Sequence, residues 1–211
     1  MVDLHFHFEP SGSVDIHGRS LKFAPNDGRP RLEMVVCADN GAWRKEDGWV
    51  SPCYAAKQPA PTTVFSAKGV AELVTLVMPL TEDQSRVRSV REAWSIAGRA
   101  FEVAADKTLD IIMIGNGNRI EVSRLASDFE WTWARFVDGD PIPIEFILIG
   151  GHKLELEGRE ILSSVRRINY LAATRTKDQF HLKTDDGVLD LSLPIKDFDF
   201  AFASPGSASV I

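Results

Sequence analysis

The chain has 211 residues, of which 44% are hydrophobic and 26% are charged, a globular composition that excludes wholesale disorder. Its 30 acidic and 24 basic residues give a formal net charge of −6, and no basic stretch stands out. We therefore expect no nucleic-acid partner, because such partners are bound through clustered lysine and arginine. No apolar run approaches the ~18 residues of a membrane span, so none is expected.

The first residues, Met1 to Leu4, carry neither the basic segment nor the apolar segment of a signal peptide, so we expect none in this chain. Residues 4–8 already alternate in the manner of a half-buried strand. A native chain usually begins with a few loose residues, so a strand with no lead-in is unusual.

Apolar and polar residues alternate along most of the chain, with turn residues between the apolar stretches. The expected strands, in chain order, include residues 4–8, 21–23, 32–36, 62–66, 72–78, 111–114, 129–133, 142–149, 154–156, 180–182 and 188–193. Many short strands separated by turns predict an all-β fold, either a sandwich or a barrel, and the length allows one large domain or two small ones. Trp131 and Trp133 share one strand face, which we expect to be the core face.

Two segments depart from this pattern. Apolar residues fall at helical spacing between residues 82 and 101, and Thr81 with Gln84 fits a capping box, so a short helix near 82–95 or an ordered loop is expected. The range 79–92 is the best candidate for a seam. The tail 204–211 is rich in serine and is predicted to be frayed.

The histidines and cysteines do not form a recognisable site. His5 and His7 lie two apart on one strand face, a geometry that can hold a metal ion, but no third ligand has supporting spacing. We expect both to face solvent. Cys37 and Cys53 show neither metal nor nucleophile spacing, and either pair or stay reduced. No phosphate-loop, dinucleotide or nucleophile-elbow motif occurs, so the sequence predicts no catalytic residue, metal or cofactor.

Aromatic and basic side chains gather in one short segment. Trp43, Trp49 and Tyr54 lie within twelve residues, with Lys45 and Lys57 beside them. Aromatic rings stack on the apolar faces of sugars, and lysine meets carboxylates or sulfates as a point charge. The segment therefore predicts either contact with an acidic glycan, with Trp49, Tyr54 and Lys57 as the binding residues, or a loop packed on the sandwich or on a neighbouring domain.

The same segment carries a resemblance to a known family. Trp49 to Pro61 reads W-V-S-P-C-Y-A-A-K-Q-P-A-P, and residues 70–79 continue as V-A-E-L-V-T-L-V-M-P. This stretch resembles the W-x-S-P-x-Y-x-x-K-x-P-A-P segment and following strand in the C-terminal β-region of heparinase II/III-like polysaccharide lyases. The opening strand and the later hairpins at 129–135 and 151–162 are similar to other parts of that region.

The resemblance implies an antiparallel, supersandwich-like β-sandwich, formed by one domain over residues 1–211, that is a fragment of a larger lyase. The strand that begins near residue 4 then fits a cut made inside that lyase and predicts an unpaired sheet edge near residues 2–9. Such lyases cleave uronic-acid glycans by β-elimination, with catalytic groups on an N-terminal α/α toroid and a G-H-x-H-A-D motif in a central β-region. The sequence contains neither segment, and His5-Phe6-His7 lacks the glycine, alanine and aspartate of that motif. The implied role is therefore non-catalytic: packing on the toroid and supporting a cleft for acidic polysaccharide, in the periplasm or outside the cell.

Two alternatives remain open. A stand-alone carbohydrate-binding module would use Trp49, Tyr54 and Lys57 as its sugar surface. An assembly domain would instead form an oligomer and bind no glycan.

Overall fold

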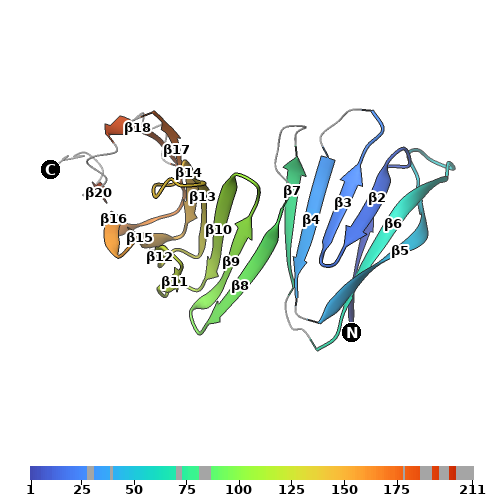
Figure 1. The fold of residues 1–211 in the computed structure, drawn as a ribbon, viewed down its shortest axis with the longest axis horizontal. Helices are drawn as coiled ribbons and strands as arrows, with labels where there is room; N and C mark the ends of the chain where they lie inside the picture. The colour runs from blue at the N-terminus through green and yellow to red at the C-terminus, as the bar shows by residue number, and fades with distance from the viewer. Residues whose placement is uncertain are drawn as a thin grey trace. The chain divides into compact units, whose positions relative to one another are not determined.

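The described part of the chain is all-β and its strands pair antiparallel with one short exception, which confirms the predicted fold class. The structure, a computed structural model, describes residues 1–27, 31–38, 40–69, 73–80, 87–177, 179–185, 192–194 and 200–202. The chain divides into two compact units, residues 1–84 and 85–211, and the division falls within the range 79–92 that the sequence indicated as a seam (Figure 1). The tail 204–211 lies outside the described residues.

The first unit is a sandwich of two antiparallel sheets, drawn from blue to green in Figure 1. One sheet has the order β1-β6-β5 and the other has the order β2-β3-β4-β7. β1 lies at the edge of its sheet, as the sequence predicted for residues 2–9. The strands are β1 (Val2–His7), β2 (Ser13–His17), β3 (Ser20–Ala24), β4 (Arg31–Cys37), β5 (Gly41–Val50), β6 (Gln58–Ala67) and β7 (Val74–Leu80).

Both sheets of the first unit contribute to one core. Phe65 of β6 is fully buried and meets the ring of Trp43 on β5 edge-on, with centroids 5.2 Å apart. Leu21 and Met34 join the same cluster from the facing sheet. The Trp43 indole N–H donates to the carbonyl of Arg19 at 2.9 Å, so its polar atom is satisfied inside the core. On β4, for example, Met34 and Val36 lie two apart on one face of the strand and both enter this core.

The second unit contains an eight-stranded sheet, β19-β18-β17-β14-β13-β10-β9-β8, and a five-stranded sheet, β11-β12-β15-β16-β20. All pairs are antiparallel except the short β16–β20 pair. The strands are β8 (Ser89–Ser95), β9 (Gly98–Ala104), β10 (Thr108–Gly115), β11 (Ile120–Val122), β12 (Leu125–Ser127), β13 (Trp131–Val137), β14 (Glu145–Ile149), β15 (Gly151–Leu156), β16 (Arg159–Ile168), β17 (Leu171–Thr176), β18 (Gln179–Thr184), β19 (Ser192–Pro194) and β20 (Phe200–Phe202). Its core takes residues from both sheets, among them Ile111, Phe146 and Leu154.

Trp131 and Trp133 do not lie on the core face of β13, so that prediction is wrong. The strand buries Ala134 and Phe136 in the core and leaves both tryptophans only half-buried on the opposite face. There the Arg135 guanidinium lies over the Trp133 ring, 5.1 Å from its centroid. Side chains alternate between the two faces of a strand, so neighbouring positions lie on opposite faces. The large tryptophans therefore led to the wrong choice of core face.

The short helix predicted near residues 82–95 is also wrong where the structure describes that range. β8 and β9 form an antiparallel hairpin closed by Ile96 and Ala97, while residues 81–86 lie outside the described residues. A spacing of four suits a helix, but an even spacing also returns to the same face of a strand. No helix occurs in the described residues, and hence none that could cross a membrane.

Candidate functional site

The β5–β6 hairpin carries the three residues predicted to bind a glycan. Trp49 stands near the end of β5, opposite Pro59, and its side chain is 59% exposed. Tyr54 lies in the connecting loop 51–57 and is fully exposed. Lys57, at the end of that loop, is also exposed. The structure therefore brings all three to one end of a single hairpin.

Ser51 holds the backbone of that connecting loop. Its hydroxyl lies 2.9 Å from the carbonyl oxygen of Cys53 and 2.7 Å from that of Ala56, within donating distance of both. The Ala56 N–H also donates to the Cys53 carbonyl at 3.2 Å. Ala55 adopts a φ of 63°, the left-handed conformation that a tight turn requires. These contacts define the backbone on which Tyr54 is carried.

The aromatic residues of this segment have two different roles. Trp43 is only 8% exposed and belongs to the core, so the packing alternative holds for it. Trp49 and Tyr54 are exposed, so the glycan-contact alternative concerns these two rings.

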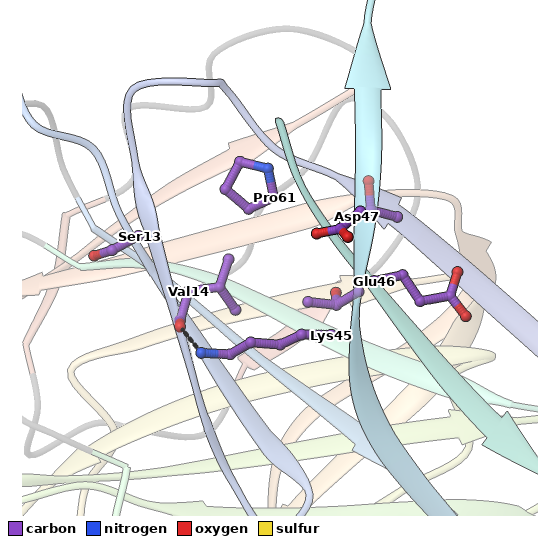
Figure 2. Close-up of a pocket in the computed structure, with 8 residues that line it drawn as sticks. Ser13, Val14, Lys45, Glu46, Asp47 and Pro61 are labelled. Carbon is purple, nitrogen blue, oxygen red and sulfur yellow. Dashed lines mark hydrogen bonds between the residues drawn. The ribbon is translucent and has the colours of Figure 1, made fainter. Parts of the chain in front are cut away.

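A pocket opens on the face of β5 that carries Trp49. Its volume is about 470 Å³, which falls within the range of about 300–1,000 Å³ for small-ligand pockets. Figure 2 shows Lys45 and Asp47 extending to one side of β5 and Glu46 to the other. Even spacing places Lys45, Asp47 and Trp49 on that one face. The lining residues are Ser13, Val14, Lys45, Glu46, Asp47, Pro61, Thr62 and Thr63.

The pocket holds one positive and one negative side chain on this face. The Lys45 ammonium donates to the Val14 carbonyl at 2.5 Å, and this bond links β5 to β2 of the facing sheet (Figure 2). Asp47 follows two residues later and is exposed. Across from Lys45, Thr63 is fully buried, and its hydroxyl has no hydrogen-bond partner within the described part of the chain.

The pKa of Asp15 on β2 is lowered, chiefly by a hydrogen bond with His17. The His17 imidazole lies 2.7 Å from the Asp15 carboxylate, and this hydrogen bond lowers the pKa of Asp15. The positive charge of Lys45 adds a smaller effect in the same direction. Asp15 is therefore ionised at neutral pH.

The histidines and cysteines form no metal centre in the described residues. His5 and His7 are both exposed on β1, as expected, and His7 Nδ1 lies 3.1 Å from the Thr62 hydroxyl. No group of three or more histidine, cysteine, aspartate or glutamate residues in those ranges is placed to hold an ion. Cys37 is buried and Cys53 is exposed, and the two do not form a disulfide.

Comparison with known proteins adds no relative to this description. No protein-family model matches the chain. No curated protein matches it either. The resemblance to heparinase II/III-like lyases therefore stays a prediction from the sequence alone.

The sequence singles out Trp49 but not the pocket on the same face of β5, which Trp49 does not line. It marks Lys45 only as a neighbour of the aromatic residues, and it does not single out Asp47. The available signal was the even spacing of Trp43, Lys45, Asp47 and Trp49, which assigns them to one face of a strand. The opposite wall comes from β2, about thirty positions earlier in the chain, which local patterning does not place.

Proposed function

We propose that the chain is the non-catalytic C-terminal β-sandwich portion of a heparinase II/III-like polysaccharide lyase, and that its first unit contacts an acidic polysaccharide. The observation that carries this proposal is the exposure of Trp49 and Tyr54 at one end of the β5–β6 hairpin. Burying such rings stabilises a fold, so two rings left in solvent within the family-like segment support a binding role.

In this role, the two rings stack on the apolar faces of sugar residues and Lys57 pairs with a uronate carboxylate or a sulfate. The chain carries a net charge of −6, so attraction to a polyanion depends on local cations such as Lys57 and weakens with added salt. The other proposed partners are the α/α toroid and central β-region of the parent lyase, in the periplasm or outside the cell.

The parent reaction removes the C5 proton of a uronate and expels the 4-linked sugar, which requires a positioned base and acid. We assign neither role to a residue of this chain. The whole chain, incubated with heparin, heparan sulfate, alginate or hyaluronan, is expected to produce no rise in ultraviolet absorbance from an unsaturated product. Turnover by the chain alone would contradict a non-catalytic role.

Trp49→Ala and Tyr54→Ala are each expected to weaken glycan binding on the order of tenfold, as loss of an aromatic anchor does. Both side chains are exposed, so the free energy of unfolding should change by no more than about 0.5 kcal/mol. Isothermal titration calorimetry measures the affinity, and Val165→Ala, at another exposed position, is the matched control. Unchanged affinity in both aromatic variants would show that the sugar surface is wrong.

A stand-alone carbohydrate-binding module is the second candidate, favoured by the pocket that lies on the same strand face as Trp49. The glycan affinity of this chain would be measured alone and again with the toroid added. An affinity that does not change on adding the toroid would favour a stand-alone carbohydrate-binding module. A stable oligomer in light scattering, together with no glycan binding, would favour an assembly domain.

A further inference from the structure

We infer that the pocket on β5 binds an uncharged, hydroxyl-rich sugar residue between Lys45 and Asp47. This inference rests on the proposed function, because it names which residue of a mixed polysaccharide occupies the pocket. Uronate-containing polysaccharides such as hyaluronan alternate a charged sugar with an uncharged one. The exposed rings of Trp49 and Tyr54, together with Lys57, then contact the neighbouring sugar residues of the same polysaccharide.

The two charged side chains are spaced to hold one ring. Lys45 and Asp47 extend to the same side of β5 (Figure 2), and two residues of a strand span about 6.5–7 Å. Hydroxyl groups on one sugar ring can bridge that distance. Val14 and Pro61 add apolar surface to the pocket, against which the C–H groups of a ring can pack.

The polar chemistry of the pocket matches hydroxyl groups, which both donate and accept hydrogen bonds. The Lys45 ammonium uses one of its three N–H groups on the Val14 carbonyl and keeps two for a ligand. The Asp47 carboxylate only accepts. One sugar hydroxyl can therefore accept from Lys45 while another donates to Asp47.

The charges of the pocket disfavour an anionic residue. Lys45 and Asp47 cancel formally on this face, whereas Glu46 projects from the opposite face and pairs with Arg44 at 2.8 Å. A uronate or sulfate near Lys45 would also meet the Asp47 carboxylate, and like charges that close repel each other. An uncharged sugar gains both hydrogen bonds without that repulsion.

The test compares Asp47→Asn with Asp138→Asn, at an exposed aspartate that does not line the pocket, in the full chain titrated calorimetrically with a hyaluronan tetrasaccharide. Asp47→Asn removes a charge-assisted acceptor and is expected to weaken binding roughly 3- to 30-fold. The sign is informative, because removing a negative charge would strengthen binding if an anionic group occupied the pocket. Asp138→Asn makes the same chemical change outside the pocket lining and is expected to leave the affinity unchanged or slightly raised.

A tetrasaccharide of alginate, which contains only uronates, is the second probe. It is expected to bind more weakly than the hyaluronan probe and to lose no affinity in Asp47→Asn. Equal effects of the two substitutions on the hyaluronan probe, or a gain of affinity in Asp47→Asn, would overturn the inference while leaving the proposed function intact. Failure of the unaltered chain to bind either probe would instead overturn the proposed function, and this inference with it.

Discussion

Replacing Phe65 with alanine is expected to lower the unfolding free energy of the first unit by about 3–5 kcal/mol, the usual cost of truncating a buried phenylalanine. Phe65 is fully buried and packs on the ring of Trp43, which is 8% exposed. The deletion removes apolar contact from both sheets, because the same cluster includes Leu21 and Met34 of the facing sheet. Small domains are stable by only about 5–15 kcal/mol, so much of that stability would be lost.

Denaturant unfolding followed by hydrogen exchange of the β4 and β6 amides measures this effect. Val165→Ala, at a side chain that is 91% exposed, is the control and should stay within about 0.5 kcal/mol of the unaltered protein. A loss below about 1 kcal/mol in the Phe65 variant would mean that the two sheets of this unit do not share the core described here.

The fold class could be predicted because alternation is a local property of a strand. Residues 4–8 and 32–36, for example, carry the signal in their own sequence, and β1 and β4 form there. Which face of a strand meets the other sheet is not local. On β13 the large side chains of the two tryptophans favour their face as the core face. The structure instead buries Ala134 and Phe136, on the opposite face, in the core.

The candidate site has the same division between local and non-local information. Trp43 and Trp49 share a face of β5, and nothing in their neighbouring sequence distinguishes a buried ring from an exposed one. The difference comes from the facing sheet, which meets β5 at Trp43 through Arg19 and at Lys45 through Val14, while Trp49 remains exposed. The pocket lies where β5 passes from buried Trp43 to exposed Trp49, and one of its walls comes from β2 of the facing sheet. It can therefore be recognised only once the packing of the two sheets is known.

The β8–β9 hairpin provides the other large expected effect. Gly98 opens β9 at a φ of 148°, and a Cβ placed there would lie 2.2 Å from the carbonyl oxygen of Ile114 and 2.9 Å from the Cα of Gly115. Both are backbone atoms of β10, the strand with which β9 pairs, so neither can move without disturbing the ladder. Gly98→Ala is expected to destabilise the second unit by roughly 2–6 kcal/mol, because overpacking and backbone strain each cost about 1–3 kcal/mol.

Gly117→Ala is the matched control for this substitution. Gly117 also has a positive φ, 87°, but a Cβ there would meet open space. Its replacement should therefore cost only the conformational penalty, about 1–2 kcal/mol. Urea unfolding at unchanged slope gives both values. A larger loss in Gly98→Ala would show that the carbonyl of Ile114 closes over the start of β9, whereas equal losses would contradict the close approach of β9 and β10 at this hairpin.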